Sequence, residues 1–134
     1  MPIVLDASIS ASWHFPDEAS EPADTVLKGL EEDSALVPVH WWFEIRNVLL
    51  IGERRGRASR VQTATFLEWL AELPIRNAPL PNGAEVLELA RKHALTFSDA
   101  AYLELAQRER IPLATLNQPL ARAALAEGVA LLAD

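Results

Sequence analysis

The chain has 134 residues, of which half are hydrophobic and 23% are charged, a composition ordinary for a globular protein. It predicts one domain spanning residues 1–134, with neither a transmembrane helix nor a signal peptide. Because there is no cysteine, a disulfide framework and a thiolate metal site are excluded, which favours a reducing cytoplasm. The formal net charge of −7 argues against broad nucleic-acid binding, although a cluster of metal-binding acids would itself make the protein acidic.

Short apolar runs flanked by Pro, Asp or Gly alternate with helical patterns along the chain. Such runs are typical of buried parallel strands. Strands are predicted at 2–6, 35–39, 113–116 and 129–132, with a weaker one around Ile75.

Apolar residues at helical spacing predict helices between these strands. Ser98 is expected to cap the fifth of these helices, and Gly128 to end the last. Strand–helix alternation predicts an α/β fold with three layers, in which a parallel twisted sheet of about four or five strands has helices on both faces. The predicted helices cover residues 21–32, 41–51, 59–73, 82–93, 98–107 and 118–127.

Four polar residues stand at strand ends or early in helices. Asp6 and Asn117 each follow a predicted strand, whereas Glu44 and Asp99 lie near the beginnings of predicted helices. Ligands of open parallel sheets bind beyond the carboxyl ends of the strands, so these four side chains can converge there. Three carboxylates and an amide oxygen would suit an oxygen-ligated divalent cation.

Each acid also has a simpler interpretation. Asp6 can cap the helix that follows it, and Asp99 can stabilise the first turn of its own helix. Glu44 lies among aromatic residues, where an unpaired carboxylate is costly, so Arg46, Arg60 or a metal is expected to compensate it.

Other sites with recognisable motifs are not supported. The chain contains neither G-x-x-x-x-G-K-[ST] nor G-x-G-x-x-G, which argues against a P-loop and a dinucleotide site. His14, His40 and His93 lack the spacing of metal ligands and are expected to be surface or helix-packing residues.

Four blocks of the sequence resemble the motif blocks of the PIN-domain family. Their order and spacing are also similar to those of VapC-type toxins of bacterial type II toxin–antitoxin systems, over essentially the whole chain. The blocks are Asp6-Ala7-Ser8, Glu44-Ile45-Arg46-Asn47-Val48-Leu49, Asp99-Ala100-Ala101-Tyr102-Leu103-Glu104-Leu105-Ala106 and Leu113-Ala114-Thr115-Leu116-Asn117.

This resemblance implies a single PIN-like domain and an endoribonuclease that depends on Mg²⁺ or Mn²⁺. The family's catalytic, metal-binding acids fall on Asp6, Glu44 and Asp99. Its usual fourth acid falls on Asn117, whose amide carbonyl can ligate a hard cation but brings no charge. We therefore expect weaker binding of a second metal.

The hydroxyl positions of the family fall on Ser8 and Thr115, which are implied to contact metal-bound water or phosphate. The alternative for both is a role as an N-cap or strand-end hydroxyl. Carboxylates that lie close together repel and raise one another's pKa unless a cation is present. Bound Mg²⁺ would lower the pKa of a coordinated water and polarise the phosphodiester, a carboxylate would accept the proton, and hydrolysis would leave a 5′-phosphate and a 3′-hydroxyl.

An arginine-rich turn follows the second predicted helix. Arg54, Arg55 and Arg57 are candidates to contact RNA phosphates beside the acids, or an acidic antitoxin tail, but such runs are also common in solvated connections. The large aromatic residues exceed what one core of this size easily hides, so some are expected to line a groove for a partner helix or a homodimer interface. These aromatic residues are Trp13, Phe15, Trp41, Trp42, Phe66 and Trp69.

The resemblance implies a homodimer that is neutralised by a small VapB-like antitoxin, whose helix and tail would occupy the groove near the acids. DNA would be contacted only through the antitoxin, and no membrane is involved. An alternative is a catalytically weakened PIN-fold module, with Asn117 at the fourth acidic position, that binds RNA or a protein without turnover. A third is a scaffold whose acids only cap helices, and its stability would not depend on divalent cations.

Overall fold

The computed structural model describes residues 1–132. Within them, four parallel strands form one sheet in the order β3-β2-β1-β4. Val4 on the central strand pairs with Leu36 on one side and with Leu113 on the other. The parallel sheet is as predicted, and its strands are β1 (Ile3–Leu5), β2 (Ala35–Val37), β3 (Ile75–Asn77) and β4 (Leu113–Ala114).

The segment predicted as a strand at 129–132 pairs with the sheet through a single bridge. Leu113 donates its N–H to the carbonyl of Ala130 at 2.9 Å and accepts from Leu132 at 3.0 Å, which places Leu131 opposite Leu113. Because β4 has only two residues, the segment at 129–132 cannot form a longer ladder with it.

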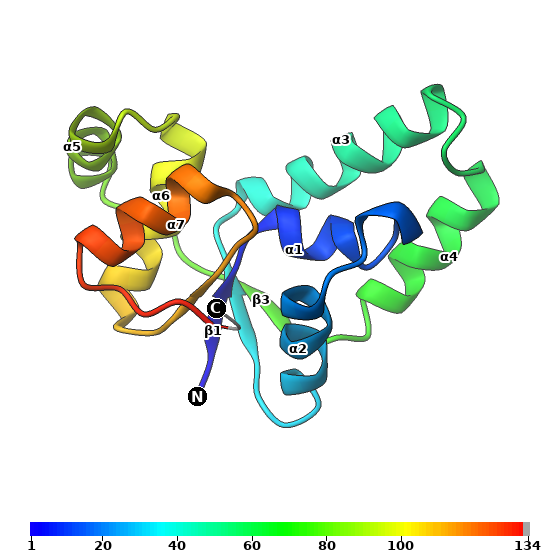
Figure 1. Cartoon of the computed structure of the whole chain (residues 1–134), viewed down its shortest axis with the longest axis horizontal. Helices are drawn as coiled ribbons and strands as arrows, with labels where there is room; N and C mark the ends of the chain where they lie inside the picture. The colour runs from blue at the N-terminus through cyan, green and yellow to red at the C-terminus, as the bar shows by residue number, and fades with distance from the viewer. Residues whose placement is uncertain (133–134) are drawn as a thin grey trace.

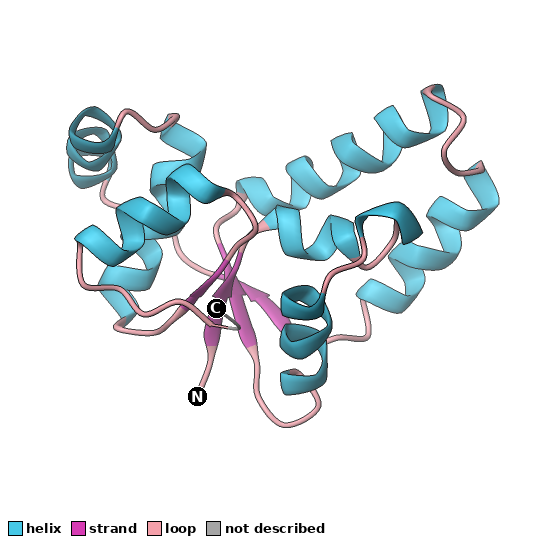
Figure 2. Cartoon of the chain, in the orientation of Figure 1, coloured by secondary structure: helices cyan, strands magenta, loops and turns pink. Residues whose placement is uncertain are grey.

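Helices cover both faces of the sheet, as predicted. In Figures 1 and 2 the first four helices lie on one side of the strands and the last three on the other. Their bounds are α1 (Ala7–Ser12), α2 (Glu21–Gly29), α3 (His40–Arg54), α4 (Arg60–Leu70), α5 (Gly83–His93), α6 (Phe97–Glu109) and α7 (Gln118–Ala126), and a 3-10 helix covers Pro16–Glu18.

Two local features differ from the sequence-based prediction. The short helix α1 is not among the helices predicted from apolar spacing, because Ile9 is its single large apolar residue and gives no periodicity. The prediction of Ser98 as the cap of α6 is wrong. The cap is Thr96, whose hydroxyl accepts the backbone N–H of Asp99 at 3.1 Å, so the helix begins one residue before Ser98.

The order of the strands reverses at the centre of the sheet. The connections from β1 to β2 and from β2 to β3 move in one direction and contain α1–α4. The connection from β3 to β4 contains α5 and α6 and returns past β1 to its other side. The carboxyl ends of β1 and β4 therefore form the switch point at which such sheets bind ligands.

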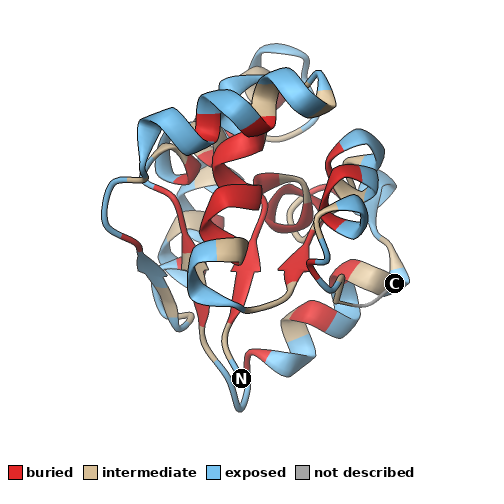
Figure 3. Cartoon of the chain, turned by 90° about the vertical axis from the view of Figure 1, so that its left-hand side faces the viewer, coloured by how far each residue is buried: buried red, intermediate tan, exposed pale blue. Residues whose placement is uncertain are grey.

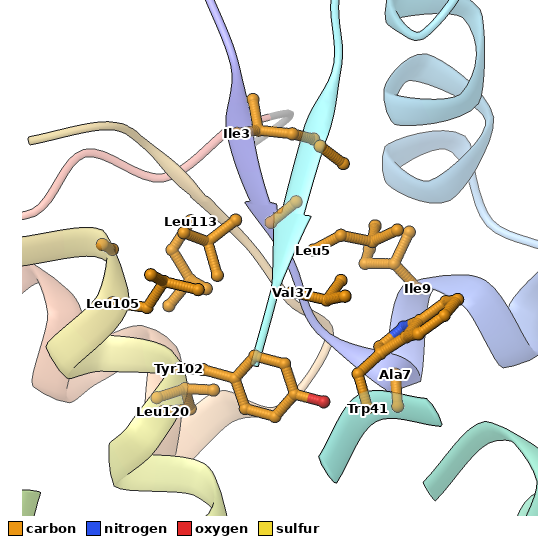
Figure 4. Close-up of a cluster of buried hydrophobic side chains, with 14 of the residues drawn as sticks. Ile3, Leu5, Ala7, Ile9, Val37, Trp41, Tyr102, Leu105, Leu113 and Leu120 are labelled. Carbon is orange, nitrogen blue, oxygen red and sulfur yellow. The ribbon is translucent and has the colours of Figure 1, made fainter. Parts of the chain in front are cut away.

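The hydrophobic core fills both faces of the sheet. Figure 3, seen from the side of α5–α7, shows the buried residues concentrated on the strands and on the inward faces of the helices. In Figure 4 Leu105, Leu113 and Leu120 lie on one side of β1, with Val37 and Ile9 on the other. This packing fixes where each strand ends, and so where the residues that follow the strands emerge.

Polar contacts join the three helices α5–α7. The carboxylate of Glu127 accepts from Lys92 Nζ at 2.8 Å, from His93 Nε2 at 2.6 Å and from Gln107 Nε2 at 3.2 Å. Hydrogen bonds from Lys92 and His93 lower the pKa of Glu127 to about 2. The C-terminal ends of α5 and α7 are therefore connected through one carboxylate.

No helix among residues 1–132 combines the length and the hydrophobicity that crossing a membrane requires.

Candidate active site

Asp6 lies at the carboxyl end of β1 with 5% of its surface exposed. Its Oδ2 accepts hydrogen bonds from Ser8 Oγ at 2.7 Å and from Thr115 Oγ1 at 2.6 Å. Burial raises the pKa of Asp6, the two hydroxyls lower it, and the charge of Asp99 raises it further. The side chain makes no capping bond to α1, so a role as a helix cap does not account for its position.

Ser8 and Thr115 connect the ends of β1 and β4. The Ser8 hydroxyl accepts the N–H of Leu116 at 2.9 Å, and the Thr115 hydroxyl accepts the N–H of Asn117 at 3.0 Å. Because each hydroxyl already accepts from the backbone, its own proton is directed to Asp6. Both hydroxyls therefore orient Asp6 through Oδ2, and neither engages Oδ1.

Asp99 and Asn117 contact each other at the neighbouring helix ends. Asp99 is in the first turn of α6, and its Oδ2 accepts from Asn117 Nδ2 at 3.2 Å. Asn117 caps α7, with its Oδ1 accepting the N–H of Leu120 at 3.2 Å. A backbone N–H can only donate, so this cap fixes the amide oxygen toward α7 and the amide NH₂ toward Asp99. Both polar atoms of Asn117 thus have protein partners, and its role as a metal ligand stays a prediction.

Glu44 extends from the first part of α3 toward α6. Its Oε1 accepts from the hydroxyl of Tyr102 at 2.5 Å and lies 3.7 Å from His40 Nε2. Burial raises the pKa of Glu44 against the lowering effect of Tyr102 and His40, and the charges of Asp6 and Asp99 add to the increase. Burial also raises the pKa of Tyr102, and the charges of Asp6 and Glu44 raise it further. The phenol therefore keeps its proton and donates it to Glu44.

The arginines considered as partners of Glu44 point elsewhere or lie farther along the chain. Arg46 donates to the carbonyl of Trp42 at 3.1 Å, and its guanidinium stacks 3.9 Å above the centre of the Trp42 ring. Arg60 begins α4, beyond the end of α3. His40, which we expected to be a packing or surface residue, does contact the site. Its Nε2 lies 2.9 Å from the carbonyl oxygen of Ser98, and its ring meets that of Tyr102 edge-on.

Three carboxylates therefore gather at the switch point. Their charges interact, since those of Asp6 and Asp99 raise the pKa of Glu44 and that of Asp99 raises the pKa of Asp6. Within residues 1–132 no Lys or Arg forms an ion pair with any of the three. In the same range, no three His, Asp or Glu side chains converge closely enough to enclose a metal ion as they stand. Repulsion among the three carboxylates and the bond from Tyr102 to Glu44 favour keeping them apart. Their oxygen atoms are nevertheless donors that suit a hard divalent cation.

The arginine-rich turn lies at the opposite end of α3 from these acids (Figure 1). Arg54 is ten residues beyond Glu44, or about 15 Å along the helix axis, so the expectation that this turn sits beside the acids is not met. Arg57 pairs with Asp17 at 2.8 Å and Glu18 at 2.6 Å. The remaining charges of the turn, on Arg54 and Arg55, are exposed.

The aromatic residues divide between the core and the surface. Phe15, Trp41 and Phe66 are buried, whereas Trp42 and Trp69 are exposed. A groove of about 650 Å³ between α4 and the segment from α1 to α2 is lined by Trp13, His14, Leu27, Val61, Phe66 and Trp69, among others. A groove lined by aromatic residues is present, as expected, and it begins at Ser12, the far end of α1 from Asp6.

The fold and this site define a class of α/β protein in which carboxylates gather beyond the central strands of a short parallel sheet. The model of the PIN domain matches residues 3–125, and the chain belongs to the PIN-domain family. It is similar to the protein named Ribonuclease VapC3 from Pyrobaculum aerophilum, with 34% identity over 125 residues that make up 90% of this chain and 93% of that protein.

Solved structures share the fold. PAE2754 from Pyrobaculum aerophilum has a TM-score of 0.69 at 24% identity, over 92% of this chain and 87% of that chain. VapBC2 from Rickettsia felis, crystallised with a DNA fragment from their promoter, has a TM-score of 0.63 at 14% identity. That match covers 98% of this chain and 97% of the other. The predicted PIN-like fold is confirmed.

Two residues that touch the acids were not selected from the sequence, Tyr102 and His40. Tyr102 falls in an apolar helical pattern and looks like a core residue, which it also is. The available signal was its position three residues after Asp99, which places both on neighbouring parts of the same helix face.

Proposed function

We propose that this protein is the toxin of a type II toxin–antitoxin system and that it is a divalent-metal-dependent endoribonuclease. The observation that supports this most directly is the set of three carboxylates at the switch point, which has no Lys or Arg partner within residues 1–132. A divalent cation is a partner whose charge and preference for oxygen ligands suit such a set. The similarity to a protein named as a VapC ribonuclease supports RNA as the substrate.

Asp6, Glu44 and Asp99 are proposed to hold Mg²⁺ or Mn²⁺. The cation would supply Lewis-acid polarisation of the phosphodiester and a water that deprotonates near neutral pH. Ser8 and Thr115 keep Asp6 fixed, leaving Oδ1 for ligation. A carboxylate of the site would accept the proton of the attacking water.

Asn117 is proposed to support one cation and not two. Its amide adds no negative charge, and its NH₂ group already neutralises part of the charge on Asp99. We infer that Asn117 acts mainly by orienting Asp99 while it caps α7. Its Oδ1 retains a second lone pair, which leaves room for a weaker ligand role.

We propose that a VapB-like antitoxin and a second copy of the chain are the protein partners, in a reducing cytoplasm. The groove between α1–α2 and α4 is apolar and aromatic, which suits the apolar face of an antitoxin helix. Arg54 and Arg55 are free to contact RNA or an acidic antitoxin tail, and DNA would be contacted only through the antitoxin. The protein would act as one PIN-like domain over residues 1–134.

The deciding experiment is cleavage of total cellular RNA by the purified, antitoxin-free protein with Mn²⁺, with Mg²⁺ and with EDTA, beside Asp6→Asn. Discrete fragments that require both metal and Asp6 are expected. If a protein that still binds Mn²⁺ gives no cleavage at high concentration, the weakened, non-catalytic module becomes the better description.

A further inference from the structure

The hydroxyl of Tyr102 makes one of the shortest hydrogen bonds in the protein, 2.5 Å to Glu44 Oε1. Tyr102 is fully buried, with 0% of its surface exposed, and it is the single tyrosine of the chain. The two residues are 58 positions apart, on α6 and α3. This contact therefore joins the two helices that supply two of the carboxylates.

The tyrosine ring is held by the core. Figure 4 shows Tyr102 beside Leu120 and the aliphatic cluster, with its hydroxyl pointing away from that cluster toward the side of Trp41 and Ala7. The ring of His40 packs edge-on against it, with centroids 5.0 Å apart. A buried aromatic ring has few rotamers, so a hydroxyl at its tip is a fixed donor.

The contact is also specific to one oxygen of Glu44. Tyr102 donates to Oε1, which is also the Glu44 oxygen nearest to His40 Nε2, and Tyr102 makes no hydrogen bond to Oε2. The same distribution occurs at Asp6, where both hydroxyls bond to Oδ2 and leave Oδ1. Carboxylates that ligate metals are commonly fixed in this way by partners that hold their other oxygen.

We propose that Tyr102 is a positioning residue that fixes Glu44 through Oε1 and thereby presents Oε2 to the bound cation. This inference rests on the proposed function. Within one turn of α6, Asp99 would act on the cation directly and Tyr102 would act through Glu44. In this role the phenol would contact neither RNA nor the metal.

The test compares Tyr102→Phe with wild type and with Ser10→Ala. The first variant removes only the hydroxyl, and the second removes a buried acceptor of Trp41 Nε1, at 3.1 Å, that does not touch the three acids. Calorimetric titration with Mn²⁺ should show affinity lowered by about 10- to 100-fold for Tyr102→Phe and unchanged for Ser10→Ala. In RNA cleavage, kcat at limiting Mn²⁺ should fall without a change in KM for RNA, and excess Mn²⁺ should restore it.

A Glu44→Ala background separates positioning from general structural support. If Tyr102 acts through Glu44, adding Tyr102→Phe to Glu44→Ala leaves the residual Mn²⁺ affinity unchanged. The proposal would be overturned if Tyr102→Phe lowered the Mn²⁺ affinity of Glu44→Ala as much as it lowers that of wild type. Tyr102 would then affect the site by a route other than Glu44.

The single tyrosine gives a measurement that does not depend on how Tyr102→Phe folds. With ¹³Cζ-labelled tyrosine, the protein has one phenol resonance, which Mg²⁺ and Glu44→Ala should each shift and Ser10→Ala should not. A resonance whose chemical shift changes neither with Mg²⁺ nor with Glu44→Ala would overturn the proposal. If wild type binds no Mn²⁺ and cuts no RNA, the proposed function itself fails. Equal Mn²⁺ affinity of wild type and Tyr102→Phe rejects the role of Tyr102 alone.

Discussion

Thr115 donates its hydroxyl proton to Asp6 across a separation of 109 residues, at 2.6 Å. The bond joins the residue after β1 to the residue after β4, the two neighbouring strands between which the strand order reverses. With Ser8 as a second donor, it keeps a buried carboxylate oriented without any Lys or Arg partner within residues 1–132. The orientation of Asp6 thus depends on the correct pairing of these two strands.

Asp6→Asn should lower metal-dependent RNA cleavage by at least about 100-fold, since loss of a ligand costs no less than loss of a supporting residue. The fold should be retained, because asparagine has nearly the same shape and can still bond to the Ser8 and Thr115 hydroxyls. Cleavage rates and far-ultraviolet circular dichroism of the two proteins test this. Equal rates would show that Asp6 is not part of the active site.

Asp6 should also make the metal-free protein less stable as pH rises. Burial holds the folded-state pKa of Asp6 above 3.8, so the folded protein binds this proton more tightly than the unfolded chain. The resulting stabilisation is complete below about pH 3.8 and is lost as pH rises through the folded-state pKa. In EDTA, the Tm of wild type should therefore fall relative to that of Asp6→Asn as pH rises above about 4. A constant difference would contradict this.

Asn117→Asp should have opposite effects with and without metal. Aspartate keeps the cap of α7 but loses the NH₂ group that Asp99 accepts, and it brings two carboxylates together. In EDTA the free energy of unfolding should fall by about 1 kcal/mol. With Mn²⁺, calorimetry should show tighter binding and a second equivalent of bound metal. Wild-type stoichiometry and affinity would mean that the amide is already an adequate fourth ligand.

Much of the fold could be predicted from the sequence because each element carries its own local pattern. The strands, and the six longer helices to within a few residues at each end, follow from apolar runs and helical periodicity. The cap of α6 was misplaced because Ser98 and Thr96 are both good caps, and the choice depends on which hydroxyl reaches Asp99. Helix α1 depends on packing against α3, which no local pattern contains.

The site was less accessible to sequence reasoning, because its hydrogen bonds join distant segments. The positions of the carboxylates could be predicted from the strand ends and from the resemblance to the family. The hydrogen-bond partner of each carboxylate oxygen could not. Tyr102 reaches Glu44 from another helix, and the amide of Asn117 faces Asp99 because its oxygen caps α7. A run of charges in the sequence also does not show which of them are paired. Arg57 belongs to the arginine-rich turn, but it forms an ion pair with Asp17, 40 residues away in the sequence.

Glu127→Gln should destabilise the protein at neutral pH but not in strong acid. The folded-state pKa of Glu127, about 2, is below its ordinary value of 4.5, so its contribution is present above pH 4.5 and is lost as pH falls toward 2. The Tm difference between wild type and Glu127→Gln should shrink over that range. Glu88→Gln, which removes an exposed pair with Arg91, is the matched control and should change Tm little at any pH.

Gly52→Ala should destabilise the junction between α3 and the turn that follows α1. A methyl group at Gly52 would lie 2.7 Å from Phe15 Cζ, and Phe15 is buried with Arg57 stacked 4.1 Å from its ring centre. We expect a loss of about 1–3 kcal/mol in denaturant unfolding, as for other overpacked cores. Gly29→Ala, at a helical position with open space around it, should instead gain up to about 1 kcal/mol. Equal effects of the two substitutions would contradict this packing.

The central place of β1 has a consequence for protein synthesis. Thr115 and Asn117 can donate to Asp6 and Asp99 only when β4 has paired with β1, because both donors lie just after β4. A growing chain must therefore have reached at least residue 117 before Asp6 and Asp99 can be held in this way. A shorter nascent chain, lying beside the ribosomal RNA and its own messenger, would lack the fixed Asp6 that RNA cleavage is proposed to need.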